Sequence, residues 1–239
     1  MKPLYIMWTE GVDEDEARLA IGAAQEVFKV LYGVCHKRGF TPFPITIRAY
    51  GTWVVPSLRR GTPYWGTRWY VDNSYSPLSK QVIGPKFLEI IRQEPWQRSG
   101  PHYDMAIIEQ DLAAEEIISP SAGEKPFILS YVLPGVGAVL SVLRLRFVLN
   151  EERRFLALRR LVAHNLGHVI GAPSKSRETN VEVSFGERHC TNVCLMRHTS
   201  GVEELVRLAA KEWEGNISFC EECQEDLLNG FLSANLCLN

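Results

Sequence analysis

The chain has 239 residues, of which 46% are hydrophobic and 23% are charged, so it is long enough to bury a sizeable core. Its formal net charge of −2 excludes the strongly basic surface typical of proteins that bind nucleic acid or anionic membranes. No stretch approaches the roughly 18 consecutive apolar residues that a membrane-spanning helix needs. We therefore expect a globular protein with neither nucleic acid nor a membrane as its partner.

The N-terminal part of the chain predicts a strand, a helix and a second strand. Residues 3–8 (PLYIMW) form a short apolar run followed closely by acidic residues, so we expect a buried strand rather than a signal peptide, and a cytoplasmic location. Apolar residues recur every three to four positions over residues 13–37, which predicts a helix that ends near Gly39 and Pro42. The alternation in residues 43–50 (FPITIRAY) predicts a strand.

Residues 51–79 hold many Trp and Tyr residues among Gly, Pro and Ser, so we expect a long aromatic loop or loose hairpin. Such a segment either packs its rings against the body of the protein or forms a wall of a binding cleft. A helix is predicted at about residues 80–95, and strands are predicted at residues 105–110, 127–133 and 137–147. This mixed order of strands and helices indicates an α+β fold.

A long amphipathic helix is predicted after residue 150. Asn150 is a favourable N-cap, and Glu151 and Glu152 lie in the first turn, where the helix dipole stabilises negative charge. Gly171 offers a C-terminal stop, with Pro173 just beyond it. The helix therefore carries the segment HNLGH (residues 164–168).

Two histidines of this helix have the spacing of a zinc site. His164 and His168 are four residues apart, so both imidazoles lie on one face and can reach one ion. A catalytic zinc needs three protein ligands. We expect His189 as the third, because it lies beside a cysteine cluster in a segment that folds back after the helix, and His198 is the alternative. Histidine pairs at this spacing also occur without a metal.

Four of the six cysteines form two close pairs. In a reducing compartment, clustered cysteines are more often metal ligands than disulfides. Two pairs of thiolates predict a tetrahedral structural zinc site. Ser218 and Glu221 form a capping-box pattern, so the second pair is expected to open a helix whose free N–H groups stabilise thiolates. The four residues are Cys190, Cys194, Cys220 and Cys223.

Taken in order, these motifs resemble those of the archaemetzincins, a family of metzincin-clan zinc metallopeptidases. The family pattern is HExxHxxGxxHC, then CxM after four residues, then CxxC after a spacer. The matching elements span about the last third of the chain. The resemblance implies an α+β, metzincin-like zincin fold with a mixed twisted β-sheet and an active-site helix. It also implies one catalytic domain, with an N-terminal subdomain at residues 1–171 and a small zinc-stapled C-terminal subdomain at residues 172–239.

The resemblance further implies two zinc ions and a peptide or protein substrate. It assigns His164, His168 and His189 to a catalytic zinc and Met196 to the Met-turn beneath that site. The strand at residues 137–147 resembles the edge strand that receives an extended peptide in this family. A structural zinc is implied at the thiols of Cys190, Cys194, Cys220 and Cys223.

The chain departs from the family pattern in three places. Asn165 occupies the position of the family's catalytic glutamate. Seventeen residues separate Gly171 from His189 where the family has two, and Ser174 occupies the literal third-ligand position. The first cysteine pair is one residue closer than in the family, and the spacer to the second pair is longer.

The first departure bears directly on activity. In a zinc peptidase the glutamate takes a proton from the attacking water, whereas the amide of Asn165 cannot accept one at neutral pH. Because general acid–base catalysis contributes about 10²–10⁴ in rate, we expect weak or absent peptidase activity. The insertion at residues 172–188 contains Glu178, Glu182 and Glu187, which either face solvent or supply a replacement base.

Three functions are compatible with these motifs. The first is a zinc-dependent metallopeptidase of the archaemetzincin type. The second is a pseudo-peptidase, a zinc-containing domain that binds peptides or proteins without cleaving them. The third is an interaction module with a cysteine-bound zinc and an incidental histidine pair, which would contain one zinc per chain instead of two.

Overall fold

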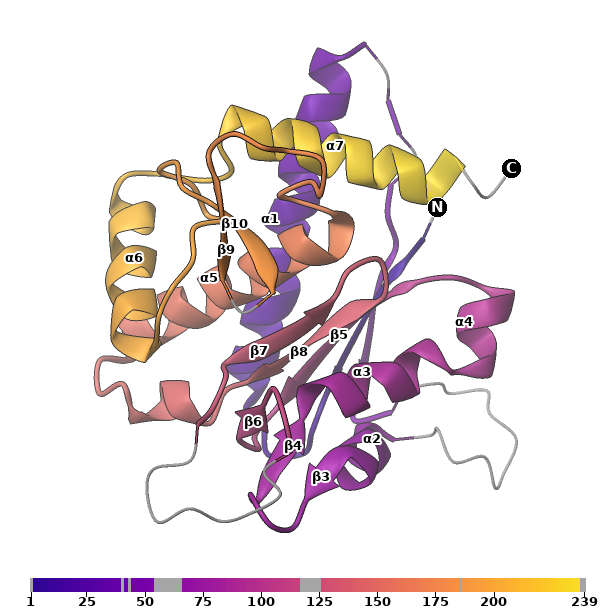
Figure 1. The fold of residues 1–239 in the computed structure, drawn as a ribbon, viewed down its shortest axis with the longest axis vertical. Helices are drawn as coiled ribbons and strands as arrows, with labels where there is room; N and C mark the ends of the chain where they lie inside the picture. Colours follow the sequence, from indigo (N-terminus) through magenta and orange to yellow (C-terminus); the bar gives the residue numbers. More distant parts are fainter. Residues whose placement is uncertain are drawn as a thin grey trace.

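The computed structural model describes residues 2–39, 41–42, 44–53, 66–116, 126–184 and 186–236. Its centre is a five-stranded sheet in which four strands are parallel and the last is antiparallel (Figure 1). Mixed sheets with one antiparallel edge strand are common in α/β and α+β folds. The strand order is β2 (Ile47–Gly51), β1 (Leu4–Trp8), β5 (Tyr103–Ile108), β8 (Gly137–Ser141) and β7 (Ser130–Leu133).

Helices cover both faces of this sheet. Side chains of a strand alternate between faces, so Ile6 packs in one apolar cluster and Met7 in the other. The first cluster contains the buried sides of α1 (Glu14–Lys37) and α5 (Glu151–Ile170). The second contains those of α2 (Thr67–Ser74) and α3 (Gly84–Arg92). The predicted strand at residues 3–8 and helix at residues 13–37 are therefore confirmed.

Two predictions for the middle of the chain are wrong in part. The segment expected as an aromatic loop contains α2, which buries Tyr70 and Val71, followed by β3 (Tyr75–Ser76). Residues 54–65 of that segment lie outside the described residues. The helix expected at residues 80–95 begins instead with β4 (Gln81–Ile83), because Val82 pairs with Leu112 of β6 (Leu112–Ala113). The chain then continues as α3 and the short α4 (Pro95–Ser99).

The edge of the sheet is formed by β7 and not by the segment at residues 137–147. A turn with Gly135 at φ +79° folds β7 back, so that β8 lies inside the sheet between β5 and β7. β8 ends at Ser141, and a 3-10 helix follows at Arg144–Phe147. Arg144 makes a bidentate contact with Asp111, which holds the chain away from the sheet after β8.

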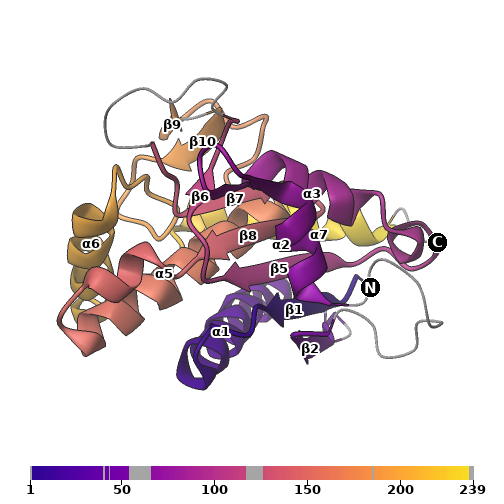
Figure 2. The ribbon, with the colours of Figure 1, turned by 90° about the horizontal axis from the view of Figure 1, so that it is seen from below.

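The C-terminal part adds a hairpin and two helices. The hairpin consists of β9 (Val181–Ser184) and β10 (Glu187–Cys190), and it lies on the side of the sheet where β7 forms the edge (Figure 2). α6 (Val202–Glu214), which the sequence did not predict, packs along α5, and α7 (Glu221–Leu236) crosses α1 and the end of α5. The main apolar cluster continues across residue 171, the expected subdomain boundary. Within the described part of the chain, no helix is long and apolar enough to cross a membrane.

Candidate metal centre

Helix α5 forms as its sequence predicts. The Oδ1 atom of Asn150 accepts a 2.8 Å hydrogen bond from the backbone N–H of Arg153, which is the contact of an N-cap. Gly171 ends the helix with φ +127°, a conformation that residues with a side chain rarely adopt. The helix buries His164 and His168, whose exposed fractions are 9% and 7%.

The two imidazoles face each other through unprotonated nitrogens. The Nδ1 atom of His164 lies 2.9 Å from the carbonyl oxygen of Leu195, and this oxygen only accepts, so Nδ1 carries the proton. His168 is held by a hydrogen bond to the backbone of Ala172. The Nε2 atoms of the two rings lie 3.1 Å apart. A cation between these two atoms would take the lone pair of each Nε2.

His189 completes a group of three histidines. It lies on β10, with its ring stacked on His164 at 5.4 Å between centroids and 5.0 Å from the ring of His168. The ligand atoms of the three rings all lie within 4.8 Å of one another. Zinc–nitrogen bonds of about 2.0–2.1 Å in a tetrahedral site place neighbouring nitrogens roughly 3.4 Å apart, so the group fits a zinc ion after small adjustments.

The other two candidates for the third position do not join this group. Ser174 lies near the surface, where its hydroxyl contacts that of Ser176. The ring of His198 lies 4.7 Å from that of His189, and its Nε2 atom is 3.2 Å from the hydroxyl of Ser184. His198 therefore contacts one member of the group and lies outside the group itself.

Burial keeps the three imidazoles neutral. It lowers the pKa of His168 to about 3, with the neighbouring His189 contributing further. Burial likewise lowers the pKa of His189 to about 4 and the pKa of His164 well below its usual value. The neutral form is the one that ligates a metal, so these three residues are in the protonation state that zinc requires.

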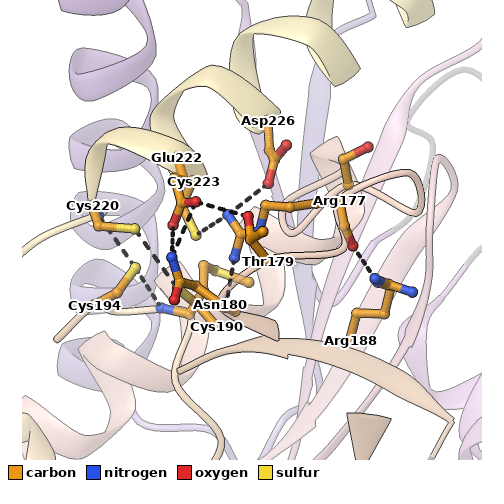
Figure 3. Close-up of polar contacts among 12 residues, drawn as sticks. Arg177, Thr179, Asn180, Arg188, Cys190, Cys194, Cys220, Glu222, Cys223 and Asp226 are labelled. Atoms are coloured by element: carbon orange, nitrogen blue, oxygen red, sulfur yellow. Dashed lines mark hydrogen bonds and ion pairs between the residues drawn. The ribbon is translucent and has the colours of Figure 1, made fainter. Parts of the chain in front are cut away.

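The four predicted cysteines form a second group (Figure 3). Their sulfur atoms lie within 4.8 Å of one another, and the distance between Cys190 Sγ and Cys220 Sγ is 3.7 Å. Zinc–sulfur bonds of about 2.3 Å in a tetrahedral site separate the sulfurs by roughly 3.8 Å, so the group fits zinc. The backbone N–H groups of Met196 and Cys220 donate to Cys194 Sγ at 3.4 and 3.3 Å, as donors to a thiolate do.

The second cysteine pair does open a helix, although the predicted cap is wrong. α7 begins at Glu221, so Cys220 immediately precedes it and Cys223 lies in its first turn. Ser218 instead accepts a hydrogen bond on its carbonyl oxygen from the backbone N–H of Leu195. This bond ties the chain before α7 to the loop that carries Met196, and it explains why the helix starts later than the capping-box pattern predicts.

The insertion is fastened to α7 beside the cysteines. Arg177 forms a 2.9 Å ion pair with Asp226 and donates to Cys223 Sγ at 3.4 Å (Figure 3). The side-chain amide of Asn180 donates to both carboxylate oxygens of Glu222. These contacts hold the hairpin in place, and they allow His189 to reach the helix although seventeen residues separate it from Gly171.

Comparisons with known proteins agree with this arrangement, although no protein-family model matches the chain. An archaemetzincin of Nanoarchaeum equitans is 26% identical over 162 residues, which cover 68% of this chain and 71% of that protein. An archaemetzincin of Archaeoglobus fulgidus is 33% identical over 91 residues, or 38% of this chain and 42% of that protein. These matches support the resemblance to the archaemetzincins that the sequence motifs indicate.

The fold also agrees with a solved archaemetzincin structure. The crystal structure of the archaemetzincin from Methanopyrus kandleri matches with a TM-score of 0.53 at 17% identity, and the match covers 96% of this chain and 94% of that one. At this identity the match shows the fold alone, and it supports the metzincin-like α+β architecture expected from the sequence. Together with the sequence matches, this structure supports a similarity to a family of zinc metallopeptidases.

Met196 lies where the family pattern expects a methionine below the active-site helix. It is fully buried, and its carbonyl oxygen accepts a 2.9 Å hydrogen bond from the backbone N–H of Cys190. A Cβ atom added at Gly167 would lie 2.5 Å from the sulfur of Met196, so the methionine sits directly against α5. The glycine between the two histidines thereby permits close contact with the methionine.

Asn165, the main departure from the family motif, turns its amide along the helix. It is 1% exposed, and its Nδ2 atom donates a 2.6 Å hydrogen bond to the carbonyl oxygen of Leu161. This contact is a local helix bond of the kind that short polar side chains form with the residue four positions earlier. The Asn165 amide group is thus held by its own helix.

Of the three glutamates in the insertion, the structure brings Glu187 to the histidines. Its Oε2 atom lies 3.8 Å from Nε2 of His168 and 4.0 Å from Nε2 of His189. Burial raises the pKa of Glu187 to about 7. Glu178 and Glu182 are exposed, and no other carboxylate of the described residues lies within 4.0 Å of the three rings.

The sequence reading missed a buried arginine that positions the site. Arg160 is 3% exposed and donates to the carbonyl oxygens of Leu195 and Arg197, while its Nε atom bonds Glu212 at 2.8 Å. It therefore holds the Leu195 carbonyl oxygen that orients His164. The sequence holds one indication of this role. Arg160 directly precedes Leu161 of the apolar stripe of α5, and a charged side chain that is buried there needs a buried partner.

Proposed function

We propose that this chain is a zinc-dependent peptidase of the archaemetzincin type whose hydrolysis of peptide bonds is weak or absent because Asn165 replaces the general base. The observation that carries the proposal is the convergence of three buried, neutral imidazoles from α5 and β10. His164, His168 and His189 are the proposed ligands of a catalytic zinc. The four thiols of Cys190, Cys194, Cys220 and Cys223 are the proposed ligands of a structural zinc, so the loaded chain contains two ions in these groups.

The chain's own residues prepare this site for hydrolysis. Zinc, when bound, lowers the pKa of a coordinated water and polarises the carbonyl group of the substrate. The hydrogen bond from His164 Nδ1 to the Leu195 carbonyl oxygen fixes the tautomer that leaves Nε2 free. Asn165 does not remove a ligand, so the proposed loss concerns proton transfer and not metal binding.

Glu187 is the proposed source of the remaining activity. Its Oε2 atom lies 3.8 Å from Nε2 of His168 and 4.0 Å from Nε2 of His189, two of the nitrogens that would hold the metal. A carboxylate there can take a proton and return it to the leaving amine, which is the task of the family's glutamate. A base of this kind comes from β10 and not from the helix.

The proposed substrate is a peptide or protein in an extended conformation. β7 is the edge strand of the sheet and packs against α5, so a peptide added to this edge would run beside the helix of the two histidines. A reducing compartment such as the cytoplasm suits the site, because it keeps the four thiols available as ligands.

Hydrolysis of a peptide panel by the zinc-loaded chain tests the role of Glu187. We expect Glu187→Gln to abolish any residual cleavage, while the zinc content and the unfolding temperature stay the same. Glu182→Gln is the matched control, because Glu182 is exposed on the neighbouring strand of the same hairpin. Equal cleavage by Glu187→Gln and the native chain would show that Glu187 is not the base.

A pseudo-peptidase is the second candidate, and the position of Asn165 favours it. Its amide is engaged with Leu161 inside the helix, so it does not hold a water in the site. This candidate predicts that the zinc-loaded chain binds peptides without cleaving them and that Glu187→Gln changes neither property. Metal analysis distinguishes the peptidase and the pseudo-peptidase from an interaction module. The interaction module would contain zinc at the cysteines and none at the histidines.

A further inference from the structure

A third group of buried potential ligands lies between α4 and the beginning of β5. It consists of Glu94, His102 and Asp104, which are 0%, 1% and 1% exposed. Each offers one ligand atom, and these atoms lie within 4.8 Å of one another. Glu94 immediately precedes α4, whereas Asp104 is the second residue of β5. Neither the family motif nor the proposed peptidase site includes these residues.

The imidazole of His102 directs its Nε2 atom into this group. Its Nδ1 atom lies 2.8 Å from the carbonyl oxygen of Gly100, so Nδ1 is the protonated nitrogen. Its Nε2 atom lies 3.3 Å from Asp104 Oδ2 and 3.8 Å from Glu94 Oε2, and neither contact has hydrogen-bond geometry. Both His102 Nε2 and Glu94 Oε2 are buried atoms without a hydrogen-bond partner.

Surrounding contacts hold the three side chains in these orientations. The hydroxyl of Tyr70 donates to Glu94 Oε1, which leaves Oε2 directed at the imidazole. The side-chain amide of Gln97 donates a 2.6 Å hydrogen bond to Asp104 Oδ2. The ring of Tyr5 stacks on that of His102 at 4.1 Å. Hydrogen bonds from outer residues to ligating side chains are the usual support of a metal site.

The two carboxylates of the group carry negative charge that a bound cation would balance. Two carboxylates are buried together, and their ion-pair contacts among the described residues are with His102, whose pKa Glu94 and Asp104 raise against the effect of burial. Burial raises the pKa of Asp104 to about 8, which reflects the cost of holding this carboxylate ionised in the interior. A divalent ion neutralises both carboxylates and uses the lone pair of His102 at the same time.

We propose that Glu94, His102 and Asp104 bind a divalent transition-metal ion, with Zn²⁺ as the best match to one imidazole and two carboxylates. Bonds of about 2.0–2.2 Å in a tetrahedral site separate the ligand atoms by roughly 3.3–3.6 Å. The observed 3.3 and 3.8 Å from Nε2 to the two oxygens require only a small movement of Glu94.

The site has a structural role in this position. α4 has five residues and none of them is fully buried, and Trp96 is its apolar contact with the second cluster. The ion joins the residue before α4 to the beginning of β5, a central strand of the sheet. It therefore adds to the apolar contacts of Trp96 and Tyr103 in fastening residues 94–104 to the core.

Anomalous diffraction from crystals of the complete chain grown with zinc tests this site directly. Data collected on either side of the zinc absorption edge should show a peak between Glu94, His102 and Asp104. Because each peak is located separately, a missing peak at the three histidines would contradict the proposed peptidase site without affecting this one. Peaks at the histidines or cysteines with none at Glu94, His102 and Asp104 would overturn the proposal.

Counting metals by mass spectrometry of the native protein provides the second test. We expect the unmodified chain to carry one metal ion more than Asp104→Asn. Asp111→Asn is the matched control, since Asp111 is a half-buried carboxylate that contacts Arg144, and this variant should keep every ion. If Asp104→Asn does not fold, the diffraction experiment on the unmodified chain decides alone. Equal metal content in folded Asp104→Asn and the unmodified chain would refute the site.

Discussion

His189 and Cys190 are consecutive residues of β10, yet they belong to two different groups of potential ligands. Neighbouring side chains of a strand point to opposite faces, so one meets the imidazoles of α5 and the other meets the thiols beside α7. A single hairpin thus serves both groups. Its position relative to α7 determines where His189 lies relative to α5.

The two groups differ in how completely the protein surrounds them. The cysteine group has four ligands and receives hydrogen bonds from two backbone N–H groups and from Arg177. The histidine group has three ligands and faces the carboxylate of Glu187 on its remaining side. Closed four-ligand zinc sites are typically structural, and three-ligand sites are typically catalytic. The comparison shows that the closed group holds the hairpin that completes the open one.

Removing one thiol should have the largest effect on the protein. Zinc binding to thiolates contributes about 10–16 kcal/mol in small zinc domains, so Cys194→Ser should cost several kcal/mol of unfolding free energy. We expect urea unfolding at a clearly lower midpoint, together with loss of zinc from both groups because His189 moves with the hairpin. Cys35→Ala is the control, since Cys35 is a buried thiol of α1 that belongs to neither group, and this variant should keep all the zinc. An unchanged midpoint for Cys194→Ser would mean that the thiols do not hold the hairpin.

Restoring the glutamate on the helix should change activity and leave the cysteine group intact. We expect Asn165→Glu to increase peptide hydrolysis by about 10²–10⁴-fold if the native chain lacks a base, measured at equal zinc content. The gain should be much smaller if Glu187 already acts as the general base. The double variant Asn165→Glu with Glu187→Gln measures how much of the hydrolysis depends on Glu187. Weaker hydrolysis by Asn165→Glu than by the native chain would contradict the assignment of residue 165 to the base position.

Cutting the link between the insertion and α7 should loosen the hairpin without removing a ligand. Arg177→Met leaves the buried Asp226 carboxylate without its partner, and such a loss costs about 3 kcal/mol. We also expect weaker zinc binding at the histidines, measured by competition with a chelator. Arg207→Met removes an exposed ion pair with Glu204 and should change stability by less than about 0.5 kcal/mol. Equal effects of the two variants would show that Arg177 does not anchor the insertion.

Filling the space under α5 should have the smallest effect. Gly167→Ala brings a methyl group against the sulfur of Met196, which costs about 1–3 kcal/mol, but alanine regains about 1 kcal/mol of helix propensity. The net expectation is a loss of about 1 kcal/mol in thermal unfolding experiments. Gly22→Ala, in a part of α1 where an added Cβ meets nothing, should instead stabilise the chain. A stabilised Gly167→Ala variant would show that Met196 does not press on the helix.

Local features of the sequence determined the helix that carries the site. The cap at Asn150, the stop at Gly171 and the four-residue spacing of His164 and His168 depend on backbone geometry over a few positions. The same is true of the two cysteine pairs, whose members are close in the chain. The family motif, which relies on these short spacings, therefore led to the correct fold.

Only the tertiary structure decided which distant residues meet. The seventeen-residue insertion made the third ligand ambiguous, and the contacts of Arg177 and Asn180 with α7 place His189 there and Glu187 beside it. Strand pairing likewise decided that β7, and not β8, lies at an edge of the sheet. A sequence specifies its local conformations through the backbone, whereas meetings between distant side chains depend on how whole elements pack.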